Sequence, residues 1–152
     1  MKRLLVVDDE PTVRTLLRDL LEIGDYDVVE AEDGETALAA VSERVPDLVI
    51  LDVMMPGLDG IEVLKELRKD HSANDLPVIL LTAKADDDTT WQGWTSGVSV
   101  FLPKPFDSDH LLDWVRRLVP DDSTNQSTSG SESSDRENDQ GLMSELRGLG
   151  SD

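Results

Sequence analysis

The sequence predicts an α/β protein with a doubly wound sheet of five parallel strands and helices on both faces. Short apolar runs of four or five residues recur along the chain, for example at residues 4–7, 48–51 and 78–81. Runs without polar interruption are typical of strands that are buried on both faces of a parallel sheet. Stretches with helical spacing of apolar residues separate these runs, and such alternation is typical of doubly wound α/β proteins.

The first half of the chain contains three predicted strands and three predicted helices. The first strand covers residues 4–7, and Pro11 is well suited to the first turn of the helix that follows. Gly24 is expected to end that helix. The remaining predicted elements of this half are a strand at 26–29, a helix at 36–41 that Pro46 stops, a strand at 48–51, and a helix that Asp59 caps.

The second half repeats the alternation. Pro77 opens the fourth predicted strand, which covers residues 78–81. A helix at about 87–96 is expected to be one of the less stable elements, because its threonines and Gly93 are poor helix formers. A fifth strand at 98–102 and a last helix at 108–119 complete the pattern.

The composition is strongly acidic. The 152 residues suit one domain, which we place at residues 1–120, and a tail at 121–152. The formal net charge is −19, and the acidic excess is present both before and after Pro120. A domain of this charge is expected to repel a phosphate backbone, so we predict no direct DNA binding.

Several classes of site and location are excluded or disfavoured. The chain has no cysteine, which excludes disulfides and thiolate metal sites. Its longest apolar runs are far shorter than the roughly 20 residues that a membrane span needs. The first predicted strand begins almost at Met1, which leaves no room before it for a signal peptide. We therefore expect a cytoplasmic protein without membrane contacts.

The tail has a different composition from the domain. Residues 121–141 are almost entirely polar and acidic, and such a segment is expected to be disordered. Residues 142–149 place Leu142, Leu146 and Leu149 on one helical face, although the segment is too short to form a stable helix alone. It is either a docking peptide that folds on a partner or a frayed end with chance periodicity. The second interpretation is favoured, because chain ends are often disordered.

Chemically distinctive residues follow four of the predicted strands. They are Asp8 and Asp9, Asp52, Thr82 and Lys104. Because the carboxyl ends of parallel strands lie along one edge of a sheet, we expect these side chains to converge there. Crowded carboxylates repel each other unless they share a proton or a cation, and hard oxygen ligands favour Mg²⁺. The ammonium and the hydroxyl could hold a phosphoryl group beside that ion.

The same positions carry motifs of a known family. The segments are VVDDEP at 6–11, DVMMPGLDG at 52–60, LTA at 81–83 and FLPKPF at 101–106. Their order and placement resemble the receiver domain of two-component response regulators, in particular the single-domain type similar to chemotaxis regulators. The resemblance covers about residues 1–119, and the joint occurrence of the motifs makes it specific. It implies the flavodoxin-like strand order 2-1-3-4-5.

The resemblance implies a phosphoacceptor site. Asp52 would be the nucleophile that accepts a phosphoryl group, and a sensor histidine kinase or a phosphotransfer protein would donate it from a phosphohistidine. Asp8, Asp9, Asp52 and the backbone carbonyl of Met54 would bind Mg²⁺, with Mn²⁺ as an alternative ion. The chain would take part in its own phosphorylation and dephosphorylation without otherwise being an enzyme.

Further roles come from the same resemblance. Thr82 and Lys104 would act in catalysis by contacting phosphoryl oxygens, and a cis peptide bond before Pro105 would direct Lys104 inward. Thr82 and Phe101 would form a conformational switch that acts on a downstream protein through the fourth helix, fifth strand and fifth helix. The family often has tyrosine where this chain has Phe101, so a plain core phenylalanine is an equally good interpretation. Met54 and Lys84 occupy positions that influence hydrolysis of the phosphoryl group.

Other interpretations of the same residues remain. Asp8 and Asp9 alone would be read as a helix N-cap pair. A flavin- or nucleotide-binding protein of this topology would need a Gly- or Ser/Thr-rich loop where residues 8–11 are acidic. An aspartyl phosphatase would carry an Asp-x-Asp pattern on its first strand. An unphosphorylated interaction module of the receiver fold is the remaining alternative. His71 and His110 receive no assigned role.

Overall fold

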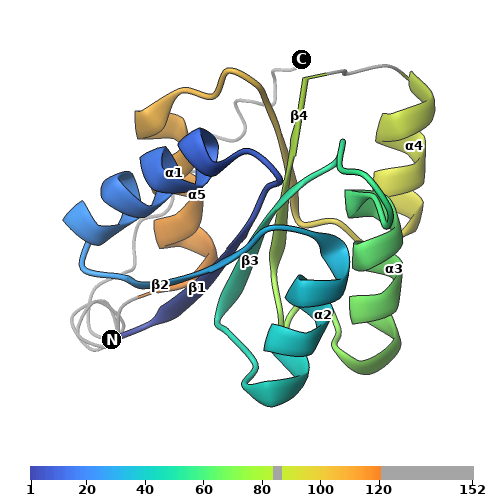
Figure 1. Cartoon of the computed structure of the whole chain (residues 1–152), viewed down its shortest axis with the longest axis horizontal. Helices are drawn as coiled ribbons and strands as arrows, with labels where there is room; N and C mark the ends of the chain where they lie inside the picture. The colour runs from blue at the N-terminus through green and yellow to red at the C-terminus, as the bar shows by residue number, and fades with distance from the viewer. Residues whose placement is uncertain (84–86, 121–152) are drawn as a thin grey trace, which may run out of the picture. The chain divides into compact units, whose positions relative to one another are not determined.

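The computed structural model describes residues 1–83 and 87–120. The predicted tail at 121–152, with its amphipathic segment at 142–149, lies outside the described residues, as does Lys84. Five strands and five helices alternate along the described chain (Figure 1). Their bounds are β1 (Arg3–Val7), α1 (Pro11–Ile23), β2 (Asp27–Ala31), α2 (Gly34–Glu43), β3 (Leu48–Asp52), α3 (Gly60–Asp70), β4 (Val78–Thr82), α4 (Asp87–Thr95), β5 (Val100–Pro103) and α5 (Ser108–Leu118).

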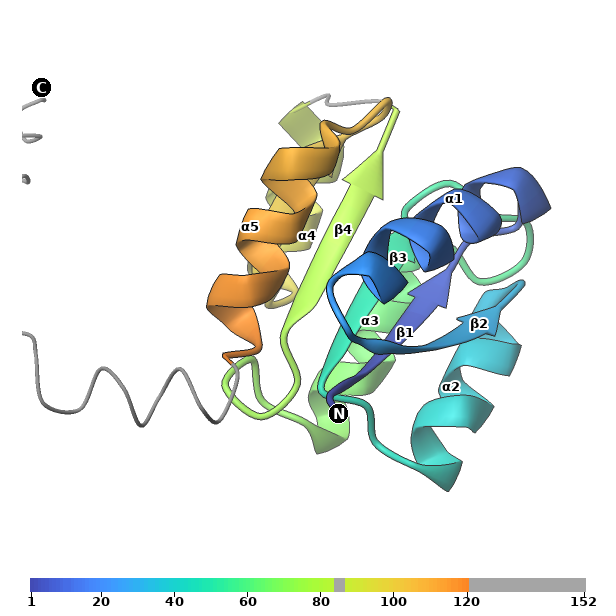
Figure 2. The same cartoon turned by 90° about the vertical axis from the view of Figure 1, so that its left-hand side faces the viewer.

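The strands form one parallel sheet in the order β2-β1-β3-β4-β5, which confirms the predicted topology. Helices α1 and α5 cover one face, and α2, α3 and α4 cover the other (Figures 1 and 2). Every residue of β3 and β4 is buried, because both strands lie inside the sheet and have helices on both sides. This explains why their sequences are continuous apolar runs rather than alternating ones.

Successive residues of β1 belong to different halves of the core. Leu4 and Val6 pack with α1 and α5, whereas Leu5 and Val7 pack with α2 and α3. This separation follows from the alternation of side chains along a strand. The core is therefore two apolar layers, one on each face of the sheet.

The strand register brings the functional edge together. Val7 pairs with Leu51 in the neighbouring strand, and Thr82 pairs with Pro103. All five strands run in the same direction, so the residues that follow Val7, Leu51, Leu81 and Pro103 emerge at one edge of the sheet. Asp8, Asp52, Thr82 and Lys104 occupy those positions.

The helix ends match most of the predicted signals. Pro11 is the first residue of α1, and Gly24 is its C-cap. Asp59 caps α3 in a capping box, in which its carboxylate accepts from the Glu62 amide and the Glu62 side chain accepts from the Asp59 amide. Helix α4 spans Asp87–Thr95, close to the predicted range.

Two strands begin later than predicted. Tyr26 donates its amide to Leu21 O at the end of α1, so it belongs to the turn and β2 starts at Asp27. Val98 similarly donates to Gly93 O and closes the turn after α4, so β5 starts at Val100. In both places a β-branched or aromatic residue suggested a strand. The backbone amide of that residue instead bonds a carbonyl at the end of the preceding helix, which keeps the residue in the turn.

The tryptophans differ in their surroundings. Trp91 and Trp94 of α4 are 68% and 55% exposed, so neither is buried in the core. Trp114 of α5 packs against the core at the edge of the layer formed with α1. Within the described residues, we find no helix that is both long enough and apolar enough to cross a membrane.

Candidate functional site

Three acidic side chains meet at the predicted edge of the sheet. Carboxylate oxygens of Asp8, Asp9 and Asp52 all lie within 4.8 Å of one another. Asp8 and Asp52 are buried, at 0% and 2% exposure, whereas Asp9 is exposed. The register of β1 and β3 causes this convergence, since it brings the ends of the two strands side by side.

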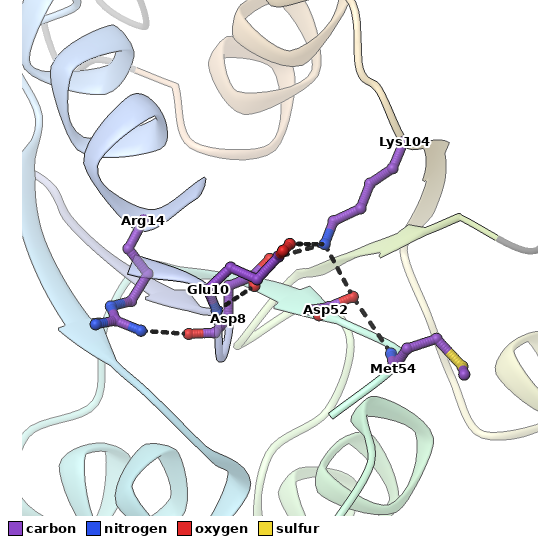
Figure 3. Close-up of polar contacts among 6 residues, drawn as sticks. All are labelled: Asp8, Glu10, Arg14, Asp52, Met54 and Lys104. Atoms are coloured by element: carbon purple, nitrogen blue, oxygen red, sulfur yellow. Dashed lines mark hydrogen bonds and ion pairs between the residues drawn. The ribbon is translucent and has the colours of Figure 1, made fainter. Parts of the chain in front are cut away.

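Lys104 lies between the two buried acids (Figure 3). Its Nζ is 2.9 Å from Asp8 Oδ2 and 3.3 Å from Asp52 Oδ1. It also lies 4.0 Å from the carboxylate of Glu10, which is mostly exposed at the mouth of the site. The Lys104 amide donates to Thr82 O, and the peptide bond from Lys104 to Pro105 is cis.

Each buried carboxylate also accepts a hydrogen bond from the backbone. Asp8 Oδ1 accepts from the Glu10 amide at 2.9 Å. Asp52 Oδ1 accepts from the Met54 amide at 3.3 Å. The Met54 side chain is 57% exposed beside the site. The two acids are therefore oriented by the loops that follow their own strands.

The electrostatics of the site show an excess of negative charge. The pKa of Asp52 is raised to about 6, because burial and, after it, the nearby charge of Asp8 outweigh Lys104 and the Met54 amide, which act in the opposite direction. Burial tends to lower the pKa of Lys104, but its pairs with Asp8 and Asp52 outweigh burial and raise it. Three carboxylates share one ammonium, so a divalent cation with a preference for oxygen ligands would fit the donor set.

Thr82 and Phe101 lie farther along the same side of the sheet. Thr82 ends β4 and is buried. Phe101 of β5 is half-buried and packs between the core layer and α4. Its ring meets the ring of Trp94 edge-on, with centroids 5.8 Å apart and planes at 66°. A Cβ on Gly93 would lie only 2.1 Å from Phe101 Cζ, so a glycine is needed where α4 passes the ring.

The structure adds two arginines that were not recognised in the sequence. Arg14 Nη1 donates to the backbone carbonyl of Asp8 at 2.7 Å. Arg68 Nε donates to Gly97 O, and its Nη1 donates to Leu76 O, both at 2.8 Å. Arg68 thereby joins α3 to the turn after α4. The two histidines do not belong to the acidic cluster among the described residues.

Comparison with known proteins gives a consistent family. The sequence profile of the response regulator receiver domain matches residues 4–116. The phosphate regulon transcriptional regulatory protein PhoB of Pseudomonas aeruginosa is 39% identical over 80% of this chain and 55% of its own length. The response regulator MprA of Mycolicibacterium vanbaalenii is 42% identical over 84% of this chain and 56% of its own length. The chain thus spans about half the length of these curated relatives.

Solved structures agree with the sequence comparison. The chemotaxis protein CheY4 of Vibrio cholerae superimposes with a TM-score of 0.73 at 31% identity, over 78% of this chain and 98% of that chain. The response regulator TrrA of Thermotoga maritima, solved in complex with Mg²⁺ and BeF, gives a TM-score of 0.70 at 42% identity, over 78% of this chain and 99% of that chain. The strand order, the acidic edge and these similarities lead to one conclusion: the chain belongs to the receiver domain family of two-component response regulators.

Proposed function

We propose that this chain accepts a phosphoryl group on Asp52 from a phosphohistidine donor and thereby switches its contacts with other proteins. The observation that carries the proposal is the position of Lys104, whose Nζ lies within 3.3 Å of Asp52 and 2.9 Å of Asp8, with Asp9 in the same cluster. This arrangement presents a nucleophile, a cation and a set of metal ligands to the same small volume. The donor would be a sensor histidine kinase or a phosphotransfer protein.

Asp8, Asp9, Asp52 and the Met54 carbonyl are the residues that would hold Mg²⁺, and Mn²⁺ has similar ligand preferences. When bound, the ion would neutralise charge on the transferring phosphoryl group. The raised pKa of Asp52 also fits this assignment, because a carboxyl whose charge is unfavourable in the metal-free site gains most from a cation. The Mg²⁺ complex of TrrA, a relative at 42% identity, supports the choice of ion.

The transfer itself is a displacement at phosphorus. A carboxylate oxygen of Asp52 forms the new P–O bond, the P–N bond to the donor imidazole breaks, and that nitrogen keeps the electron pair. Such reactions have a loose transition state, so positioning and charge stabilisation supply most of the catalysis. Lys104 would pair with one phosphoryl oxygen, and the Thr82 hydroxyl would bond another. The chain would act only on its own phosphorylation state.

Phosphorylation would change the surface formed by α4, β5 and α5. The Thr82 hydroxyl would move toward the phosphoryl group, and Phe101, which packs against α4, would follow. A downstream protein would read the change. We propose that residues 1–120 form this receiver domain and that 121–152 form a separate acidic tail.

The receiver domain itself is proposed not to bind DNA. Counting residues 1–120 alone, 25 acids against 12 bases give a net charge of −13, which would repel a phosphate backbone. The relative RpaA of Synechocystis, 40% identical over 78% of this chain and 49% of its own length, is named as DNA-binding. That property would lie in the part of such relatives that this chain does not match. We place the phosphorelay in the cytoplasm, on the basis of the family.

Intact-mass analysis after incubation with acetyl phosphate and Mg²⁺ tests the proposal. The wild-type chain should gain one phosphoryl group, and D52N should gain none. The matched control is D19N, which makes the same change at an exposed aspartate of α1 and should be labelled like the wild type. Undiminished labelling of D52N would show that the phosphoacceptor is another residue.

A further inference from the structure

The backbone carbonyl of Asp8 is held by a side chain from α1. Strand β1 ends at Val7, and Asp8 is the first residue of the loop that carries the acidic cluster. Arg14, in the first turns of α1, donates Nη1 to this carbonyl at 2.7 Å (Figure 3). The contact therefore ties the start of the helix to the peptide unit between two proposed metal ligands.

The other side of the Arg14 guanidinium is anchored on β2. Its Nε donates to Glu30 Oε1 at 3.1 Å, and the Arg14 side chain is only 15% exposed. Glu30 also accepts from Arg18, one turn further along α1. Hydrogen bonds from Arg18 and Arg14 lower the pKa of Glu30, so this carboxylate stays charged and holds Arg14 in place.

Asp8 is then fixed at each of its polar groups. Its amide donates to Ala31 O, its carbonyl accepts from Arg14, and its two carboxylate oxygens accept from the Glu10 amide and from Lys104. Asp9 is exposed, and the direction of its Cα follows from the plane of the preceding peptide. Because the carbonyl of Asp8 and the amide of Asp9 share that plane, holding the carbonyl sets the orientation of the peptide unit and with it the direction in which Asp9 leaves it.

We infer that Arg14 is a positioning residue for the metal site, which it serves by orienting the Asp8–Asp9 peptide. Its guanidinium points at a carbonyl and at Glu30 rather than toward Asp52, so it acts through the backbone and not on the phosphoryl group. The inference deepens the proposed function, since it assumes that Asp8 and Asp9 bind the ion. Partners that orient metal ligands in this way typically affect metal affinity by about 10- to 100-fold.

The test compares two arginines of the same helix. R14M removes the donor to the Asp8 carbonyl and one donor to Glu30. R18M removes the other donor to Glu30 but leaves the carbonyl contact in place. Calorimetric titration of the unphosphorylated full chain with MgCl₂ should give an affinity about tenfold weaker for R14M and unchanged for R18M. Equal affinities for R14M and the wild type, or equal losses for both variants, would overturn the inference.

A second measurement separates positioning from general stability. Amide hydrogen exchange in metal-free buffer should be faster at residues 8–10 in R14M and unchanged there in R18M. R14K keeps a positive charge beside Glu30, so the variant should fold. Lysine lacks the planar guanidinium that reaches two acceptors at once, so R14K should bind Mg²⁺ more weakly than the wild type. Wild-type affinity in R14K would contradict the role of the guanidinium.

The proposed function can fail separately from this inference. If the wild-type chain binds Mg²⁺ but is not labelled by acetyl phosphate, the phosphoacceptor assignment fails while the comparison of R14M with R18M still holds. If the wild type is labelled normally and R14M binds Mg²⁺ as the wild type does, only the positioning role fails.

Discussion

Lys104 Nζ lies 3.3 Å from Asp52 Oδ1, yet the pKa of the Asp52 carboxyl is raised to about 6. The ion pair is therefore too weak to offset burial and the neighbouring charge of Asp8. In the metal-free protein, the site is an unfavourable arrangement of like charges. This has measurable consequences for stability.

The first prediction concerns the pH dependence of folding without metal. The Asp52 carboxyl has a pKa of 3.8 when unperturbed and about 6 when folded, so the folded state binds the proton more tightly. The contribution of this carboxyl to the free energy of unfolding is fully present below pH 4, and it is lost as the pH rises through 6. The loss is at most roughly 3 kcal/mol, at about 1.4 kcal/mol per pKa unit. D52N should therefore be more stable than the wild type at pH 7 and similar to it at pH 4.

Urea unfolding with a chelator present measures this difference. Added Mg²⁺ should stabilise the wild type at pH 7 and D52N much less, because binding to the folded state shifts the equilibrium. A difference in stability between D52N and the wild type that stays constant from pH 4 to pH 7 would show that ionisation of Asp52 does not destabilise the fold.

The acidic cluster was predictable from sequence, whereas Arg14 was not. Asp8, Asp52 and Lys104 each follow an apolar strand, and a parallel sheet necessarily brings such positions to one edge. The Arg14 contact is made to a backbone carbonyl, which any residue at position 8 would provide. Among the described residues, the only side chain that Arg14 pairs with in this arrangement is that of Glu30, which is far from Arg14 in sequence. A pair between residues so far apart leaves no recognisable pattern in the local sequence.

The orientation of α4 was also beyond the sequence pattern. Trp91 and Trp94 have helical spacing and would ordinarily be assigned to the buried face. The structure instead turns Gly93 inward, because the ring of Phe101 needs the space, and this leaves both tryptophans exposed. The packing of one aromatic residue on the neighbouring strand thus determines which face of the helix is buried.

A second prediction follows from this close approach. G93A should destabilise the fold by about 1–3 kcal/mol, because its Cβ would lie 2.1 Å from Phe101 Cζ and the ring would have to move. Alanine normally favours a helix over glycine by about 1 kcal/mol, so the expected effect is opposite to helix propensity. Urea unfolding of G93A, F101A and the double variant measures the coupling. If G93A is equally destabilising without the ring, the clash is not its cause.

The third prediction concerns the lifetime of the phosphorylated form. Met54 is exposed next to Asp52 and has no group that could orient an attacking water. We expect M54N to hydrolyse its phosphoryl group several times faster than the wild type, and M54N with K84E faster still, although Lys84 lies outside the described residues. Decay is followed by intact mass after removal of the phosphoryl donor.

The control for Met54 makes the same change far from the site. I23N replaces another exposed apolar residue, at the end of α1, and should leave the decay rate unchanged. Decay in M54N that is no faster than in I23N would contradict the expectation that Met54 slows hydrolysis because it cannot orient an attacking water.

The last prediction follows the switch from Asp52 to α4. Phe101 contacts Trp94 edge-on and also touches Gly93, so a movement of the Phe101 ring must change the surroundings of Trp94. Trp114 lies on α5, where it packs on the other layer of the core beneath the guanidinium of Arg117. Beryllium fluoride with Mg²⁺, added as a phosphoryl mimic, should therefore change the fluorescence of Trp94 most and that of Trp114 least. Trp91, exposed on the same helix, should respond if α4 moves as a whole.

Variants that retain one tryptophan each, with phenylalanine at the other two positions, separate these signals. A response of Trp94 alone would mean that the ring of Phe101 moves while α4 stays in place. A joint response of Trp91 and Trp94 would mean that the helix itself shifts, which its close contact with Phe101 through Gly93 favours. If calorimetry shows that the mimic binds while both tryptophans of α4 remain unchanged, the signal does not pass through Phe101. The partner-binding surface must then be sought away from α4.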